Sequence, residues 1–372
     1  MQPVYLDFNA STPVAPEVAD IMRHALGTAH GNPSSGHWAG LPARKMVEDA
    51  RTKVAALLGC APQEIVFTSG GSEANNHALK GMFFASSKER PHFITSSVEH
   101  PAIVAPLHFL ERLGARVTWL PVDGTGLVDP DGLRRAITPD TVLVTIMHAN
   151  NETGTIQPIA ECAAIARERG VRFHTDAAQS VGKIPTRVDE LGVDLLTMAG
   201  HKFHAPKGIG ALYIRDGLRL EPLIHGAGHE GGRRAGTESA MLTAALGVAA
   251  SLAADLAPME QVHGLRDRFW AALTQSFGDS VVLNGHLERR LPNTLNVSFV
   301  GRVGAEILAA VPEVAASTGS ACHSGRVDLS PVLNAMGVAP QIGMGAIRFS
   351  LGRTTTEDEI DHVVAALRRV LG

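Results

Sequence analysis

The sequence predicts an α/β fold with a large domain on a mostly parallel sheet and a smaller α+β domain. Through the first two-thirds of the 372 residues, short apolar runs alternate with segments of helical spacing. Such alternation implies right-handed crossovers and helices on both faces of the sheet. From about residue 250 long helical stretches dominate. We therefore expect a large domain over 14–250 and a small domain formed by 1–13 and 251–372.

The expected strands of the large domain are short and apolar along their length, which is typical of strands buried on both faces. They cover 64–68, 92–96, 116–120, 141–147, 171–175, 195–198 and 210–214. A helix is expected over 158–169, where Ile159, Cys162 and Ala166 recur at helical spacing. In the small domain we expect helices over 241–256, 259–277 and 356–371, strands over 294–300 and 346–350, and a loop near 317–325.

Composition narrows the class of protein. Hydrophobic residues make up 45% and charged residues 19%, as in a folded globular protein. A net charge of −4 gives no general attraction to nucleic acid or to an anionic membrane, so we expect neither partner. No apolar run approaches the roughly 20 residues that span a bilayer, and the first residues lack a secretion signal. The three cysteines fit a reducing compartment, so the expected location is cytoplasmic.

Five of the expected strands are followed by small or polar residues suited to ligand binding. They are Gly71 and Ser72 after 64–68, His100 after 92–96, Asn151 after 141–147, Asp176 and Gln179 after 171–175, and His201 and Lys202 after 195–198. Each has an ordinary structural explanation on its own, such as a glycine-rich turn or a solvated lysine. In open α/β sheets, however, ligands bind at the carboxyl ends of the strands, so these residues are expected to meet on one rim.

The combination on this rim suits one cofactor, pyridoxal 5′-phosphate (PLP). Small residues that open a helix offer backbone N–H groups to a phosphate. The PLP aldehyde requires a lysine for its Schiff base, and the pyridine nitrogen requires a carboxylate that keeps it protonated. Lys202 and Asp176 are the candidates for these two roles. No metal site is expected.

Ordered motifs along nearly the whole chain carry a resemblance to one family. They include Tyr5-Leu6-Asp7, Gly31-Asn32-Pro33, Phe67-Thr68-Ser69-Gly70, Val98-Glu99-His100, His174-Thr175-Asp176-Ala177-Ala178-Gln179, Gly200-His201-Lys202, Arg234-Ala235-Gly236-Thr237, Leu291-Pro292-Asn293-Thr294, Gly319-Ser320-Ala321-Cys322 and Ile347-Arg348-Phe349-Ser350. The chain resembles the cysteine desulfurases of the NifS/IscS type, within the class V aminotransferase group of PLP enzymes. The resemblance implies fold type I of the PLP-dependent transferases.

The same resemblance implies a role for each matching residue. Lys202 resembles the Schiff-base lysine, Asp176 the partner of the pyridine nitrogen, Gln179 the partner of the ring hydroxyl, and His100 the stacking imidazole; Gly71, Ser72 and His201 resemble phosphate ligands; Thr237 resembles a phosphate ligand of the neighbouring subunit in a homodimer; Asn151, Arg348 and Asn32 resemble substrate-binding residues, with Asn151 also facing the cofactor. An arginine suits a substrate carboxylate because its planar fork binds both oxygens.

Cys322 resembles the nucleophile that takes sulfur from the substrate. It lies in a stretch of small residues, the kind of loop from which a thiol could reach a bound sulfur and carry it away. The implied reaction converts L-cysteine to L-alanine, leaves a persulfide on Cys322, and passes the sulfur to an acceptor protein or thiol. Cys60 and Cys162 are expected to be small buried hydrophobes in helical settings.

One departure from the family pattern concerns the phosphate site, and two alternatives to a cysteine desulfurase stay open. Ala199 stands where many desulfurases have a phosphate-binding serine, so one phosphate hydrogen bond is expected to be missing. Parts of the sequence resemble selenocysteine lyase, which would release selenide from L-selenocysteine, although Pro101 departs from that pattern. Another PLP enzyme of the same fold would keep Lys202, Asp176 and His100 but would not need Cys322.

Overall fold

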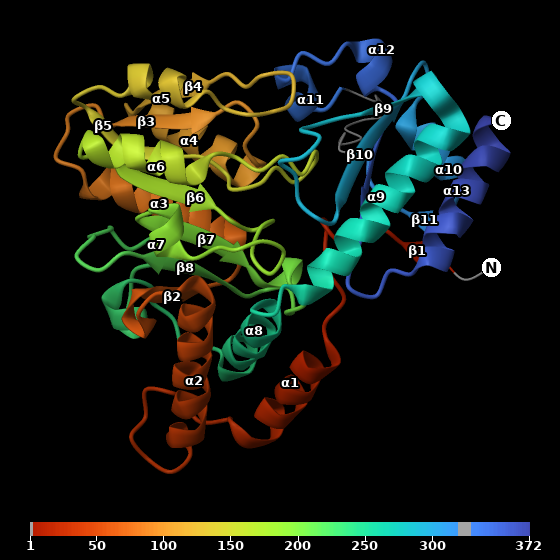
Figure 1. Cartoon of the computed structure of the whole chain (residues 1–372). Helices are drawn as coiled ribbons and strands as arrows, with labels where there is room; N and C mark the ends of the chain where they lie inside the picture. Colours follow the sequence, from red (N-terminus) through yellow and green to blue (C-terminus); the bar gives the residue numbers. More distant parts are fainter. Residues whose placement is uncertain (1–2, 319–328) are drawn as a thin grey trace.

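A seven-stranded sheet forms the centre of the larger part of the molecule in the computed structural model, which describes residues 3–318 and 329–372 (Figure 1). The strand order is β2-β8-β7-β6-β5-β3-β4. The strands are β2 (Ile65–Thr68), β3 (His92–Ser96), β4 (Arg116–Leu120), β5 (Thr141–Thr145), β6 (Arg172–Asp176), β7 (Leu195–Ala199) and β8 (Gly210–Ile214). The expected α/β class with a mostly parallel sheet is confirmed.

The direction of β8 decides which strand ends share a rim. β8 is antiparallel to both of its neighbours, β7 and β2, whereas the other pairs in this sheet are parallel. Two reversals restore the direction, so β2 runs the same way as β7 although it lies at the edge of the sheet. The carboxyl ends of β2, β3, β5, β6 and β7 therefore point to one side.

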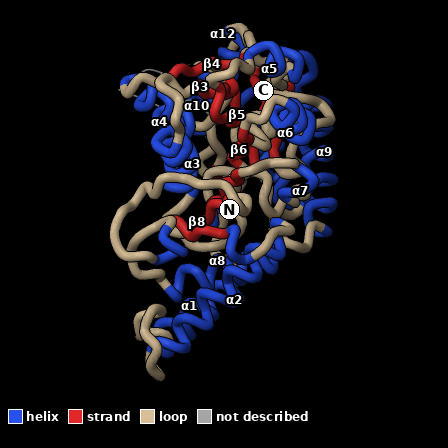
Figure 2. The backbone as a smooth tube through the Cα atoms, turned by 90° about the vertical axis from the view of Figure 1, so that its left-hand side faces the viewer, coloured by secondary structure: helices blue, strands red, loops and turns tan. Residues whose placement is uncertain are grey.

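Helices cover both faces of this sheet, as Figure 2 shows for α3 and α4 on one side and α6 and α7 on the other. The buried residues accordingly form two clusters, one between the sheet and α3 and α4, the other between the sheet and α2, α6 and α8. The helices of this part are α1 (Pro16–Thr28), α2 (Gly40–Leu58), α3 (Gly71–Ala85), α4 (Pro101–Arg112), α5 (Pro130–Ala136), α6 (Ile159–Glu168), α7 (Val188–Leu191) and α8 (Ala240–Ala253).

The remaining part has its own buried cluster, built on a three-stranded antiparallel sheet of order β12-β10-β9. The long helix α9 packs beside this sheet and α13 (Figure 1). Its strands are β9 (Val281–Leu283), β10 (Thr294–Phe299) and β12 (Ala346–Ser350), with the parallel pair β1 (Val4–Tyr5) and β11 (Val314–Ala315); its helices are α9 (Ala257–Phe277), α10 (Gly304–Ala310), α11 (Pro331–Ala335), α12 (Pro340–Gly343) and α13 (Glu357–Leu371). The domain boundaries near residues 13 and 250 stay an interpretation.

Local sequence explains where the last helix begins and how both of its ends are stabilised. The Thr356 hydroxyl accepts a hydrogen bond from the Glu359 backbone N–H, and the Glu359 carboxylate accepts one from the Thr356 backbone N–H. This capping box satisfies donors that a helix start leaves free. Acidic residues fill the first turn, and Arg368 and Arg369 occupy the last turn, where a cation interacts favourably with the helix dipole.

One cysteine differs from its expected setting. Cys162 is fully buried on α6, as expected, but Cys60 lies beyond the end of α2 and is half-buried. The helix stops at Leu58 because Gly59 adopts a φ of 70°, a left-handed conformation that glycine takes without strain. Burial raises the pKa of both thiols to about 12, so neither is a reactive thiolate near neutral pH.

No described helix is by itself long and apolar enough to cross a membrane. Within residues 3–318 and 329–372, one pair of consecutive helices, α8 with the α9 segment, is long and apolar enough when taken together, but it bends by 70° between its two halves.

The packing of α2 against α8 yields a stability prediction. A Cβ added at Gly247 would lie 2.6 Å from the Cα of Ala50, a backbone atom that cannot move aside cheaply. We expect Gly247→Ala to lower the free energy of unfolding by about 1–3 kcal/mol in chemical denaturation, as overpacking does. Gly264→Ala is the matched control in α9, where an added Cβ meets nothing within 4 Å. It should be neutral or stabilising by up to about 1 kcal/mol; equal losses in both variants would contradict the packing argument.

Candidate active site

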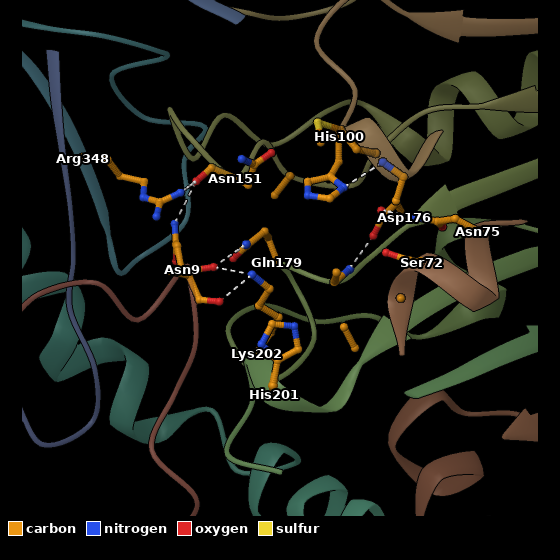
Figure 3. Close-up of a pocket in the computed structure, with 17 residues that line it drawn as sticks. Asn9, Ser72, Asn75, His100, Asn151, Asp176, Gln179, His201, Lys202 and Arg348 are labelled. Carbon is orange, nitrogen blue, oxygen red and sulfur yellow. Dashed lines mark hydrogen bonds between the residues drawn. The ribbon is translucent and has the colours of Figure 1, made fainter. Parts of the chain in front are cut away.

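A pocket of about 440 Å³ lies on the rim where the five strands end (Figure 3). Residues from the large sheet, the N-terminal segment and the small sheet all contribute to its wall. The lining residues are Asn9, Ala10, Gly71, Ser72, Asn75, His100, Ala102, Met147, Ala149, Asn151, Asp176, Ala178, Gln179, Ala199, His201, Lys202 and Arg348. The structure thus brings together all eight residues that the strand-end pattern placed on this rim.

The start of α3 forms a part of the pocket wall that is suited to binding an anion. Gly70 precedes the helix with a φ of 147°, which favours glycine, and Gly71 and Ser72 open the first turn with their backbone N–H groups. A Cβ at Gly71 would lie 3.3 Å from the Cβ of Ala199, so a larger residue would fill the space beside the helix end. Backbone N–H groups and the helix dipole make such an end a site for phosphate.

Asp176 ends β6 and is buried, with only 7% of its surface exposed. One carboxylate oxygen, Oδ2, accepts a 2.7 Å hydrogen bond from the side-chain amide of Asn75 on α3. The other, Oδ1, accepts the Ala178 backbone N–H at 2.9 Å. Two donors fix the plane of the carboxylate, as a partner for a ring nitrogen requires.

Lys202 lies on a single 3₁₀ turn, Gly200–Lys202, directly after β7. Its Nζ donates to the backbone carbonyls of Asn9 at 2.6 Å and Ala10 at 3.0 Å. Burial and the positive charge of Arg348 lower the pKa of Lys202 to about 8, although Asp176 and Asp7 oppose the shift. The amine is therefore neutral, and nucleophilic, at a pH more than two units below that of an ordinary lysine.

His100 caps α4, and its ring protonation follows from that cap. Its Nδ1 accepts the Ala102 backbone N–H at 3.0 Å, so the neutral ring carries its proton on Nε2. Burial and the charge of Lys202 lower the pKa of His100, and Asp176 opposes them. Burial also lowers the pKa of His201 to about 4. His201 is therefore a neutral imidazole at pH 7 and can offer a phosphate a hydrogen bond but no charge.

Gln179 lies between the pocket and the N-terminal segment (Figure 3). Its Nε2 donates to the backbone carbonyl of Asn9 at 2.9 Å, and its Oε1 accepts Nζ of the buried Lys183 at 2.9 Å. The Asn9 side chain is tied in turn to Thr294 at 2.8 Å and to Asn293 at 3.0 Å, both in or next to β10. The wall on this side is therefore a connected polar network.

Arg348 reaches the pocket from β12 of the small sheet. Its Nη1 donates to the Asn151 backbone carbonyl at 2.9 Å, and its Nη2 pairs with the Asp7 carboxylate at 2.8 Å. Its Nε is buried and has no hydrogen-bond partner among the described residues. Among the described residues only two of the five guanidinium N–H groups have partners, which leaves donors for a carboxylate that enters beside Asn151.

Three residues assigned from the family resemblance are not part of this pocket. Asn32 is exposed between α1 and α2, where its side chain accepts the Ser34 backbone N–H. Thr237 lines a separate hollow with Ser69 and Arg234. Cys322 lies outside the residues that the structure describes. The roles of all three stay predictions.

Sequence reasoning missed four residues at or behind the pocket wall: Asn9, Asn75, Glu99 and Lys183. Asn75 left a signal, because a polar residue one turn into a helix after a phosphate-type loop should face the same ligand. Glu99 accepts hydrogen bonds from Ser96 and the Met147 backbone, and burial raises its pKa to about 8. It joins the ends of β3 and β5 directly beside His100.

The residues present fit PLP. The start of α3 offers a phosphate site whose size is set by Gly71 and Ala199, and Asp176 is a fixed carboxylate. Lys202 provides an amine of lowered pKa in the same pocket, together with the His100 imidazole. Ala199 lines the pocket without a hydroxyl, in line with the missing phosphate hydrogen bond expected from the sequence.

Comparison with known proteins identifies the family. The model of the family described as aminotransferase class-V matches residues 4–363. The chain belongs to the class V aminotransferase family. A cysteine desulfurase IscS from Dictyoglomus turgidum is 48% identical over 372 residues, covering 99% of this chain and 94% of the relative.

Comparison with solved structures agrees with the comparison of sequences. A structure titled "NifS-like protein" has a TM-score of 0.93 at 36% identity, covering 100% of this chain and 99% of its own. A second, titled "SspA in complex with cysteine", has a TM-score of 0.85 at 38% identity, covering 95% of this chain and 100% of its own. The resemblance to the cysteine desulfurases and the expected fold are confirmed.

The environment of Lys202 predicts a pH dependence. Because only the neutral amine reacts, labelling of Lys202 in the cofactor-free protein should reach half its maximum near pH 8. Arg348→Met removes a positive charge and leaves Asp7 unpaired, and both changes favour the charged amine. The midpoint should therefore rise, as measured by an amine-reactive reagent and peptide mass spectrometry over a pH series.

The matched control for this measurement is Arg266→Met, which removes a buried arginine that does not influence the Lys202 pKa. Its midpoint should stay near 8. A midpoint near that of an ordinary lysine in the unmodified protein would contradict the electrostatic account.

Proposed function

We propose that the pocket around Lys202 carries out the cysteine desulfurase reaction with Cys322 as sulfur acceptor. The chain is a PLP-dependent cysteine desulfurase, as its full-length similarity to such enzymes establishes. The observation that carries the site assignment is the convergence of Lys202, Asp176 and Arg348 on one pocket. In the reaction L-cysteine loses its sulfur and leaves as L-alanine, while the enzyme thiol becomes a persulfide.

Lys202 is the proposed base of the reaction. PLP, when bound, supplies an electron sink that stabilises negative charge at the substrate's α-carbon. A pKa of about 8 lets Nζ of Lys202 hold a proton and release it near neutral pH. The sequence left Lys202 and His100 open for this role. The cap bond from Ala102 to Nδ1 puts the neutral His100 proton on Nε2, which makes that nitrogen a donor and favours Lys202 as the base.

Arg348 and Asn151 are proposed to orient the substrate. Arg348 is only 5% exposed and is already fixed by Asp7 and the Asn151 carbonyl, so little side-chain entropy is lost when it binds a carboxylate. A substrate held by its carboxylate there lies in the same pocket as Lys202 and His100.

A homodimer is part of the proposal, with Thr237 of each copy completing the phosphate site of the other. In support, Thr237 and the exposed Asn32 both lie outside the pocket of their own chain. Sedimentation of the purified enzyme as a monomer would contradict this arrangement. A cytoplasmic location, and an acceptor protein or thiol that removes the persulfide sulfur, belong to the same proposal.

L-cysteine is favoured over L-selenocysteine as the substrate. The curated relatives are cysteine desulfurases, and the SspA structure contains cysteine. A selenocysteine lyase would share the same pocket, so alanine release from each of the two substrates distinguishes the two enzymes.

The test of this function measures alanine released by the PLP-loaded enzyme from L-cysteine and from L-selenocysteine with a reductant. We expect release from L-cysteine, and a persulfide on Cys322 when the reductant is left out. Cys322→Ala should bind PLP normally but form no persulfide on the enzyme. Release from selenocysteine alone would make the enzyme a lyase, and no release from either would contradict both assignments.

A further inference from the structure

Lys183 is a buried lysine behind the pocket that the reaction does not use. It follows Gln179 by four residues in the turn after β6, and 7% of its surface is exposed. Its Nζ donates to the side-chain oxygen of Gln179 at 2.9 Å and to that of Asn9 at 3.3 Å. Both partners are neutral amides, and no carboxylate of the described residues forms an ion pair with Lys183.

This placement is costly for the fold. Moving an ammonium group out of water without a carboxylate partner is unfavourable, and a methionine would fill a similar space without that cost. Burial lowers the pKa of Lys183 well below its ordinary value, and the charges of Lys202 and Arg348 lower it further. Core packing therefore does not account for a lysine at this position.

The contacts of Lys183 do explain how the Gln179 amide is oriented. An amide can turn over and exchange its oxygen and its nitrogen, because the two ends have nearly the same shape. On one side of Gln179 the Asn9 carbonyl can only accept, and on the other Nζ of Lys183 donates. These two neighbours set Oε1 toward Lys183 and Nε2 toward Asn9, and they leave one N–H of Nε2 unused in a residue that lines the pocket.

We propose that Lys183 is a positioning residue that fixes the Gln179 amide so that an N–H, and not an oxygen, faces the ring hydroxyl of PLP. The inference rests on the proposed function, which places the cofactor ring beside Gln179. Without Lys183 the Gln179 oxygen loses its donor inside a buried network, and only the Asn9 carbonyl, which also accepts from Lys202, still favours this orientation of the amide. The amide is then held less firmly, and its hydrogen bond to the cofactor weakens even though Gln179 is unchanged.

The visible absorption band of the lysine-bound cofactor reports this hydrogen bond. A hydrogen-bond donor to the ring oxygen would compete with the proton that this oxygen shares with the Lys202 nitrogen. Loss of the donor should therefore raise the pKa at which the absorption band changes with pH. We expect Gln179→Ala to raise this pKa by about one, the effect of one hydrogen bond. Lys183→Met should shift this pKa in the same direction. Lys183→Gln, which keeps an N–H donor, should have a pKa close to the wild-type value.

The double variant and a matched control separate positioning from loss of stability. If Lys183 acts through Gln179, Lys183→Met combined with Gln179→Ala should shift the pKa no further than Gln179→Ala alone. Val181→Ala removes a fully buried side chain in the same turn and should lower the melting temperature without moving the band.

Four results would overturn the proposal. An unshifted band in Lys183→Met, or additive shifts in the double variant, would show that Lys183 does not act through Gln179. A shift of similar size in Val181→Ala would attribute the effect to general loosening. If the wild-type protein gave no visible band with PLP, the proposed function would fail and this inference with it, whereas a normal wild-type band with an unshifted Lys183→Met would overturn this inference alone.

Discussion

The backbone carbonyl of Asn9 accepts hydrogen bonds from both Lys202 and Gln179, at 2.6 and 2.9 Å. A carbonyl oxygen has two lone pairs, so this atom is fully used by two side chains that come from different strand ends. The Asn9 side chain meanwhile bonds to Thr294 and Asn293 beside the small sheet. One residue near the N-terminus thus joins Lys202, Gln179 and the second sheet.

The same arrangement explains the electrostatics of the pocket. Burial lowers the pKa of Lys183, and the charges of Lys202 and Arg348 lower it further. Burial and the charge of Arg348 lower the pKa of Lys202, and the carboxylates that oppose them there are Asp176 and Asp7. The carboxylate of Asp7 is already paired with Arg348. With a pKa of about 8, the Lys202 amine is therefore partly neutral near neutral pH. Burial of these cations costs stability, a cost typical of functional sites.

Much of the rim could be predicted from sequence because it depends on strand direction alone. The strands over 92–96, 116–120, 210–214 and 346–350 are found at the expected residues, and the residues after five strand ends meet in one pocket. The strand expected over 141–147 ends earlier, at Thr145. The backbone N–H of the next residue, Ile146, still donates to the His174 carbonyl, but Ile146 lies beyond the last residue pair of β5 and β6. The carboxyl end of β2 also lies on the predicted rim. Although β2 lies beyond the antiparallel β8, the two reversals of strand direction at β8 cancel.

The second side of the pocket could not be predicted from patterns. Lys183 contacts Asn9, and Arg348 contacts Asp7, across 174 and 341 residues of sequence, and the local sequence around these residues does not indicate either partner. Arg348 was assigned only through the family resemblance, and Asn9 and Lys183 not at all. Asn32 and Thr237 show the opposite case, because a family role assigned to them is not fulfilled within one copy of the chain.

The central claim is that Lys202, and not the neighbouring buried Lys183, holds the cofactor. The most direct measurement is borohydride reduction of the PLP-loaded enzyme followed by peptide mass spectrometry. The account predicts the phosphopyridoxyl group on the peptide that contains Lys202, with the lysine at position 183 unmodified. Attachment at Lys183, or at any lysine outside the pocket, would contradict it.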